Sequence, residues 1–257
     1  MSNNLPEHFF RPGQEHFVSS VDESGLGAVD AVADDSAPSS MWGEAWKNLR
    51  KRPLFWISAF IIFVAILLAA FPSLFTSTDP NFCELSRSLE APSPGHYFGF
   101  DRQGCDIYSR TIYGARASVS VGIFTTIVVT LIGAIFGSLA GYFGGWLDAV
   151  LSRLTDIVFA IPFLLAAIVV MQMFREQRAT WTVVVVLAVF GWPQIARITR
   201  GAVMSVKNEE FISAAQALGE SKWKILLRHI LPNSAAPIIV YATVALGTFI
   251  VAEATLS

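Results

Sequence analysis

Charged residues are scarce in this chain. They make up 15% of its 257 residues, whereas an average soluble domain has about 25%. Hydrophobic residues make up 53%, and the mean hydropathy is +0.53. Such a composition needs a lipid bilayer to cover its apolar surface, so we expect an integral membrane protein.

Motifs for catalysis and cofactor binding are missing as well. The chain has no Gly-x-x-x-x-Gly-Lys-Ser/Thr loop for nucleotide phosphates, no His-Glu-x-x-His and no Gly-x-Ser-x-Gly. Its four histidines are scattered, whereas structural zinc requires four ligands together. We therefore expect no catalytic residues, no cofactor, no metal and no ATP hydrolysis by this chain itself. Its basic residues are explained by membrane topology, which leaves nucleic-acid binding without support.

Long apolar runs dominate what is present. Five of them approach the length of a membrane-spanning helix, about 17 to 25 residues. They cover residues 54–75, 117–142, 157–174, 181–198 and 235–254. Tryptophans stand near the ends of several runs, where the indole ring favours the membrane interface. The sequence predicts an all-α integral membrane protein with five spans.

Lysine and arginine orient the chain in the membrane. A basic cluster at 47–52 precedes the first run, and six more basic residues surround the loop between the fourth and fifth runs. Positive charge favours the cytoplasmic side, and the four crossings between these regions make both assignments agree. The loop at 76–116 is then extracytoplasmic, as is the turn at 175–180, although Arg175 and Arg178 run against the rule there.

Composition divides the chain into three segments. Residues 1–45 form an acidic tail, with seven acidic residues and one basic residue in the first forty. This balance predicts a disordered cytoplasmic tail, and because the start is polar we expect no secretory signal there. Residues 46–116 hold the first span and the extracytoplasmic loop. Residues 117–257 form the core membrane domain, with a polar cytoplasmic loop at 205–233.

Within that loop, residues 209–219 predict a short surface helix. Its apolar face consists of Phe211, Ala214, Ala215 and Leu218. Glu210 lies in the first turn, where the helix dipole favours acid, and Gly219 is a stop. Ten residues span about 15 Å, too short to cross the membrane. A second helical pattern begins at Ser221 and ends at Pro232. Docking into a partner groove and lying on the lipid surface are the two alternatives.

This loop resembles the EAA loop of ABC-importer permeases. The family pattern is Glu-Ala-Ala, three residues, Gly, nine residues and Ile-x-Leu-Pro. Here the corresponding residues are Ser213-Ala214-Ala215, Gly219 and His229-Ile230-Leu231-Pro232, with Ser213 in place of Glu. The resemblance implies that the helix docks on a cytoplasmic ATPase, through Glu210, Phe211, Ala214, Ala215, Leu218 and Gly219.

The extracytoplasmic loop holds the only two cysteines, Cys83 and Cys105. A structural disulfide between them and two free thiols are both open; a bridge would contribute roughly 3 kcal/mol. Residues 95–118 are similar to the segment G-T-D-x-x-G-R-D…Y-G-A-R-x-S, which precedes the second helix of C-type permease subunits in dipeptide and oligopeptide importers. Cys105 stands where that pattern has Arg.

Together the resemblances cover the chain from about residue 46 onward. They imply a MetI-like permease bundle of six helices, of which five are present, so we expect the chain to lack its last helix. They also imply a peptide permease subunit of the cell inner membrane. Its partners would be a second homologous permease, two ABC ATPase subunits and an extracytoplasmic peptide-binding protein. Nickel or another small solute is the alternative cargo; a secondary transporter or a membrane-anchored structural protein is the alternative class.

Several residues within the spans stand out. Gly133, Gly137 and Gly141 share one helical face, which predicts close helix packing. Pro162 and Pro193 predict kinks, and Asp156 is expected to pair locally with Arg153. Glu253 lies about 27 Å into its helix. An acid at that depth should face protein or water, so we expect Glu253 to line or brace the outer mouth of a pathway.

Overall fold

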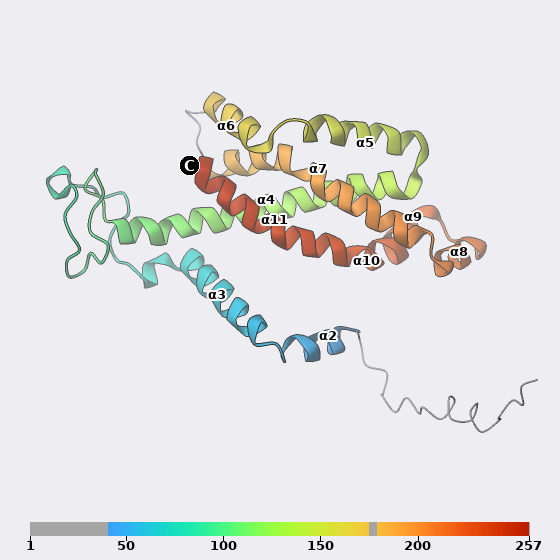
Figure 1. Cartoon of the computed structure of the whole chain (residues 1–257), viewed down its shortest axis with the longest axis horizontal. Coiled ribbons are helices and arrows are strands. Elements are labelled where there is room, and N and C mark those ends of the chain that lie inside the picture. Colours follow the sequence, from blue (N-terminus) through green and yellow to red (C-terminus); the bar gives the residue numbers. More distant parts are fainter. Residues whose placement is uncertain (1–40, 175–178, 257) are drawn as a thin grey trace, which may run out of the picture. The chain divides into compact units, whose positions relative to one another are not determined.

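The computed structural model describes residues 41–174 and 179–256 (Figure 1). Most of the acidic tail and of the turn at 175–180, with Arg175 and Arg178, lies outside the described residues, as does Ser257. The chain forms two units, which divide between Ile57 and Ser58. Each unit is described by itself.

The first unit contains α2, Met41–Leu49, and the beginning of α3, Pro53–Ala70. Aromatic side chains hold the turn between these helices. The ring of Trp46 meets the edge of Phe55 at 5.8 Å, and Trp56 Nε1 donates a hydrogen bond to the Arg50 carbonyl at 3.0 Å. Basic residues therefore lie directly before an apolar helix whose large side chains are exposed on all sides, as expected in lipid.

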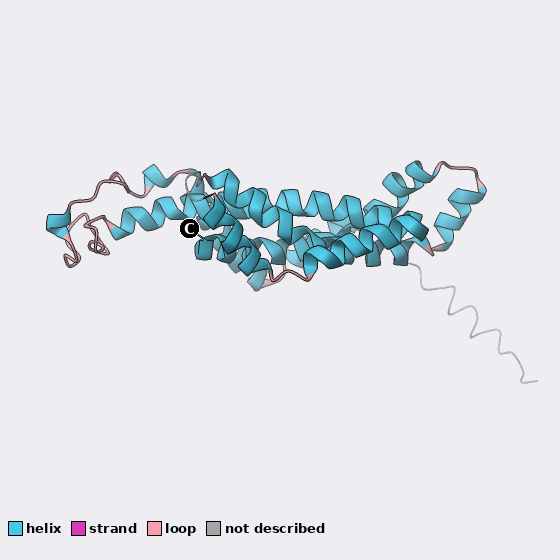
Figure 2. Cartoon of the chain, turned by 90° about the horizontal axis from the view of Figure 1, so that it is seen from above, coloured by secondary structure: helices cyan, strands magenta, loops and turns pink. Residues whose placement is uncertain are grey.

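The second unit is built on three long helices, α4, α7 and α11, which pack side by side (Figure 1). Their bounds are Ile107–Phe143, Thr180–Lys207 and Ala235–Leu256. Together with α3 they are the four described helices that are long and apolar enough to cross a membrane. The pair α5, Gly145–Phe159, and α6, Phe163–Met173, adds a fifth span if it is counted as one. Figure 2 shows the helices of the chain from above, in cyan. The all-α prediction is confirmed.

The predicted third span is broken. Between α5 and α6 the axis bends by 74°, with Pro162 as the residue that precedes α6. Proline cannot donate the next helical hydrogen bond, so the expected kink is a full break. The predicted start at residue 157 was wrong, because α5 already begins at Gly145. Polar residues such as Asp148 and Arg153 lower the hydropathy of its first turns.

Other boundaries also moved. The helix predicted from residue 117 begins at Ile107, where the carboxylate of Asp106 caps it by accepting the Ser109 N–H at 3.0 Å. The first span ends at Ala70 instead of continuing to residue 75, and a 3₁₀ turn, η2 at Pro72–Leu74, follows it. Pro193 lies inside α7 without ending it.

Three clusters of buried apolar side chains follow one another along the bundle. One, near the C-terminal end of α11, includes Val121, Leu187 and Leu256. A central cluster includes Val129, Trp192 and Phe249. The third joins the ends of α4 and α7 to the short helices that follow α7, and consists of Tyr142, Val203, Ile212, Ala215, Ile225, Leu226 and Ile230. The core therefore continues from the spans into the predicted surface loop.

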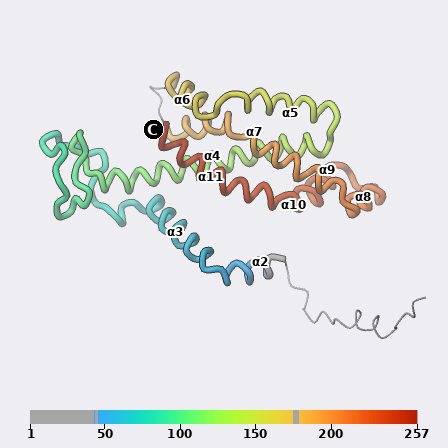
Figure 3. The backbone as a smooth tube through the Cα atoms, in the orientation of Figure 1, coloured from blue at the N-terminus to red at the C-terminus, as the bar shows by residue number. Residues whose placement is uncertain are grey.

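The loop between α3 and α4 is tied to the start of α4 (Figure 3). A disulfide joins Cys83 and Cys105, and Cys105 is fully buried. The carboxylate of Asp101 accepts the Cys105 N–H at 3.0 Å and Arg110 Nη1 at 2.6 Å. The backbone hydrogen bond from Cys105 is the main reason that the pKa of Asp101 is lowered. This loop is therefore anchored both covalently and by charge.

Candidate coupling site and membrane cavities

The predicted surface helix is α8, Glu210–Ala217. It follows Glu209, whose backbone is extended, and Glu210 occupies the first turn as expected. Gly219 has a φ of 79°; its N–H bonds to the Gln216 carbonyl at 3.0 Å, and the Glu220 N–H bonds to the Ala215 carbonyl at 3.2 Å. These two bonds form a Schellman motif, which needs a left-handed residue at the position of Gly219. The predicted helix stop is confirmed.

The faces of α8 differ from the prediction in one respect. Phe211 and Leu218 are 44% and 85% exposed, and Ala214 is exposed beside them. Ala215 is buried with Ile212 in the third cluster, so it faces the chain's own core and does not belong to the exposed face. Ile212, whose burial was not predicted, holds α8 against this cluster. An apolar residue three positions before Ala215 was the available signal.

The segment after α8 stays helical for longer than expected. Ser221 caps α9, Lys222–Ile225, by accepting the Lys224 N–H at 3.4 Å. A widened π turn, η5 at Leu226–Ile230, and α10, Leu231–Asn233, then lead to α11. The expectation that Pro232 ends the pattern was wrong, because Pro232 lies in the first turn of α10, where its missing N–H costs little.

Glu220 connects α8 to the helices that follow it. Its carboxylate lies 2.7 Å from Lys224 Nζ and 2.8 Å from His229 Nε2. The hydrogen bond from Lys224 is the largest cause of a lowered pKa for Glu220, and His229 adds to it. The sequence analysis did not predict these contacts. They hold the connection after α8 to α9 and η5.

The three glycines of α4 lie directly against α7. A Cβ atom on Gly133 would stand 2.7 Å from Ile195 Cγ2, and one on Gly137 would stand 2.7 Å from Thr199 Cβ. A Cβ atom on Gly141 would stand 2.9 Å from the Arg200 carbonyl oxygen. These distances are below any ordinary carbon contact, so the two helices are as close as they are because the glycines carry no side chain.

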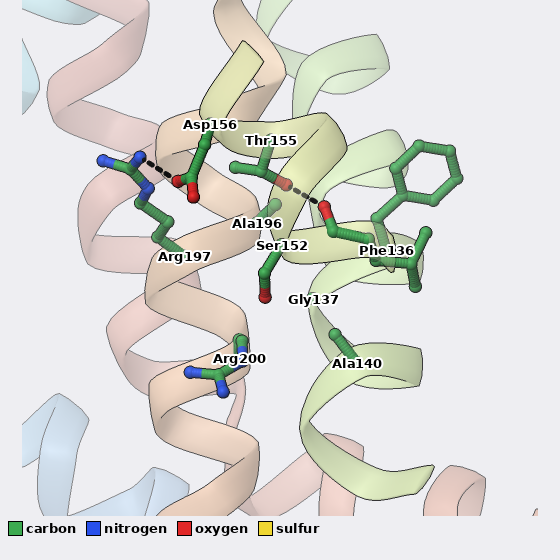
Figure 4. Close-up of a pocket in the computed structure, with 10 residues that line it drawn as sticks. Phe136, Gly137, Ala140, Ser152, Thr155, Asp156, Ala196, Arg197 and Arg200 are labelled. Carbon is green, nitrogen blue, oxygen red and sulfur yellow. Dashed lines mark hydrogen bonds and ion pairs between the residues drawn. The ribbon is translucent and has the colours of Figure 1, made fainter. Parts of the chain in front are cut away.

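Two ion pairs join α5 to α7 beside a cavity of about 380 Å³. Figure 4 shows the one between Asp156 and Arg197. Arg200 holds Asp148 with Nε and Nη2, each at 2.6 Å. Arg197 Nη2 lies 2.7 Å from a carboxylate oxygen of Asp156. The prediction that Asp156 pairs with Arg153 was therefore wrong. The guanidinium of Arg197 also stacks over the ring of Phe159 at 4.0 Å. The acidic residues of α5 are thus neutralised by arginines of α7.

A second cavity, of about 300 Å³, lies at the break between α5 and α6. Its wall includes Pro162 at the break, Gly191 and Gln194 of α7, and Tyr241 of α11. Irregular backbone at membrane depth is tolerated where it lines a cavity or is buried in protein. The break between α5 and α6 lines such a cavity, so its irregular backbone is compatible with a position inside the membrane.

Glu253 lies near the end of α11 and is 6% exposed. Its Oε2 accepts a hydrogen bond from Ser118 of α4 at 2.6 Å. A cavity of about 200 Å³ adjoins the carboxylate. An acid at this depth thus faces protein and a cavity, as expected of an ionisable group in a membrane helix.

Comparison with known proteins gives two family matches. Residues 133–257 match the family described as binding-protein-dependent transport system inner membrane component. Residues 40–92 match the N-terminal transmembrane domain of oligopeptide transport permease C.

Individual relatives match over most of the chain. A dipeptide transport system permease protein, DppC, of Alkalihalophilus pseudofirmus is 40% identical over 87% of this chain and 73% of the relative. An oligopeptide transport system permease protein, OppC, of Bacillus subtilis is 34% identical over 99% and 79%, respectively. A glutathione transport system permease protein, GsiD, of Escherichia coli is 34% identical over 91% and 77%.

Proposed function

This chain belongs to the family of binding-protein-dependent transport system inner membrane components, and we propose that it carries peptides into the cytoplasm as one subunit of an ABC importer. It is a multi-pass membrane protein, and its family works with ATPase and substrate-binding partners. The relatives named for dipeptide and oligopeptide transport support a peptide cargo over nickel.

The observation that carries the proposal is the construction of α8. Phe211, Ala214 and Leu218 form its exposed face. Ile212 and Ala215 are buried in the third cluster, which also contains residues of α4 and α7. A groove on an ATPase would close on the exposed face, and Glu210 and Gly219 would mark the two ends of the contact. Because α8 packs against α4 and α7 through this cluster, a displacement of α8 would also displace the membrane helices.

A route for the peptide is supported by the cavity at the break between α5 and α6. The bend near Pro162 keeps the two half-helices from filling this space. We place the inner end of the route near the ion pairs of Arg197 and Arg200, and its outer end near Glu253. The close contacts of Gly133, Gly137 and Gly141 would keep α4 and α7 together while the route opens and closes.

We also propose the orientation and the full assembly. The basic residues before α3 and around α8 favour a cytoplasmic N-terminus and a cytoplasmic α8. The loop closed by Cys83 and Cys105 then faces outward, where a disulfide persists. A second homologous permease, two ATPase subunits and an extracytoplasmic peptide-binding protein would complete the importer.

Uptake of labelled peptides tests this function. Cells lacking the gene should take up less labelled dipeptide and oligopeptide, and the gene should restore uptake, while labelled nickel should be unaffected. Peptide uptake that continues without any ATPase subunit would point to a secondary transporter. Uptake of nickel alone would overturn the peptide assignment.

A further inference from the structure

Glu253 is a buried acid without a basic partner among the residues that the structure describes. Its Oε2 is satisfied by Ser118. Its other oxygen, Oε1, has no hydrogen bond or ion pair with the residues that the structure describes, and it is not among their fully enclosed polar atoms. One oxygen of a carboxylate that is 94% buried therefore remains for another group.

Glu253 belongs to the wall of a cavity of about 200 Å³. The end of α11 meets α6 and the start of α7 there, at one end of the bundle (Figure 1). The lining residues are Ala117, Val121, Met171, Ala179, Thr180, Val183, Glu253 and Leu256. Among these, Glu253 alone is ionisable, and most of the others are apolar. Among the described residues, the cavity wall thus has one acidic group in largely apolar surroundings.

A carboxylate in such surroundings is unfavourable unless a cation or several hydrogen-bond donors reach it. The positively charged group that fits best is an ammonium, which is compact and has three donors. The volume lies below the roughly 300 to 1,000 Å³ of pockets that enclose a whole small ligand. The cavity therefore suits one end of a longer molecule.

We propose that Glu253 binds an ammonium group of the transported peptide at the outer end of the route. This inference rests on the proposed function, because a peptide is the cargo that carries such a group. The ammonium comes from the peptide's free N-terminus or from a lysine side chain. Ser118 acts as a positioning residue, since it holds Oε2 and so leaves Oε1 to the ammonium.

The test compares peptides that differ only in charge, in the complete importer reconstituted in vesicles. Uptake is measured for trialanine, for N-acetyl-trialanine and for an N-acetylated tripeptide with one lysine. With Glu253→Gln we expect the KM of trialanine to rise at least tenfold, while uptake of N-acetyl-trialanine stays as in the wild type. Glu253→Asp should retain part of the preference for trialanine, and Ser118→Ala should raise its KM less than Glu253→Gln does.

The acetylated lysine peptide separates the two sources of the ammonium. If Glu253→Gln also raises its KM, the site accepts either ammonium; if its KM is unchanged, the site reads the N-terminus, and both results support the proposal. Glu84→Gln, an exposed acid of the outer loop, is the matched control and should change nothing.

Equal losses for trialanine and N-acetyl-trialanine would overturn the proposal and leave Glu253 as a brace. Should Glu253→Gln fail to assemble, Glu253→Asp and Ser118→Ala still decide: an unchanged KM for trialanine in both would also overturn it. Failure of the proposed function has a different signature, because wild-type vesicles would then take up no peptide at all.

Discussion

Arg200 of α7 and Asp148 of α5 face each other through two parallel hydrogen bonds of 2.6 Å. Arginine alone among the basic side chains can form this fork with a carboxylate. Ser152 donates a third hydrogen bond to the same carboxylate at 3.0 Å. Since α7 is followed within a few residues by α8, the pair connects the helix before the proposed coupling surface to α5, the first half of the broken span.

Replacing Arg200 with lysine should therefore loosen α5 from α7. Lysine keeps the charge but loses the fork, and both side chains are partly exposed, so we expect a loss of about 1 kcal/mol in the free energy of unfolding. The measurement is thermal unfolding of the purified protein. Arg153→Lys, at an exposed position of α5, is the control and should leave Tm unchanged. Identical Tm values for the two variants would contradict this assignment.

The glycines of α4 allow a second comparison within one helix. Gly137→Ala places a methyl group against Thr199 and the α7 backbone, whereas a Cβ atom on Gly114 has no neighbour within 4 Å. We expect Gly137→Ala to destabilise the protein by about 1 to 3 kcal/mol, the usual effect of overpacking. Gly114→Ala should be neutral or stabilising by up to about 1 kcal/mol, because alanine favours helix. The two Tm shifts should thus have opposite signs or differ clearly in size.

Local signals predicted a large part of this architecture. The apolar runs of α3 and α11 are uninterrupted, so hydropathy alone located them. Gly219 marked the end of α8 because a left-handed residue at a helix end is nearly always glycine or asparagine. In each case the information lies within one or two helical turns of sequence.

Features that depend on tertiary contacts were missed. Asp156 is three residues from Arg153, yet its partner is Arg197, 41 residues away. The start of α5 was missed because its acidic residues lower the local hydropathy, as loop residues do. Their partners, Arg197 and Arg200, lie on α7 and are far away in the sequence. For the same reason Ala215 was placed on the exposed face of α8, since only the position of the third cluster decides which side of a short helix is buried.

The contacts of Glu220 predict a pH dependence. The pKa of this carboxyl is lowered in the folded protein from its ordinary value of 4.5. A group with a depressed folded pKa stabilises the structure above its unfolded pKa, and that contribution is lost as the pH falls through the folded pKa. Hydrogen exchange of the α8 and α9 amides should therefore be faster in Glu220→Gln than in the wild type at pH 7. The difference should persist to about pH 4.5 and shrink below it. A difference that grows below pH 4.5 would contradict the assignment.

The proposed coupling surface of Phe211, Ala214 and Leu218 is tested by two neighbouring residues of α8, of which one is exposed and the other buried. Phe211→Asp puts a charge on the exposed face, so the fold should remain intact while binding of the ATPase subunit weakens at least about thirtyfold, the effect expected of an interface anchor. Ile212 is fully buried, so Ile212→Asp should instead lower Tm and the yield of folded protein. Co-purification with the ATPase and Tm, measured on both variants, separate these effects.

Ser213→Asp supplies the matched control for charge on the same helix. Ser213 is exposed but lies more than 90° around the helix from the face of Phe211, Ala214 and Leu218, at about 100° per residue. If the exposed apolar face is the coupling surface, Ser213→Asp should keep most of the ATPase binding that Phe211→Asp loses. Equal losses in the two variants would mean that added negative charge, and not the loss of an apolar contact, disrupts the complex. Full binding by Phe211→Asp would place the contact elsewhere on the protein.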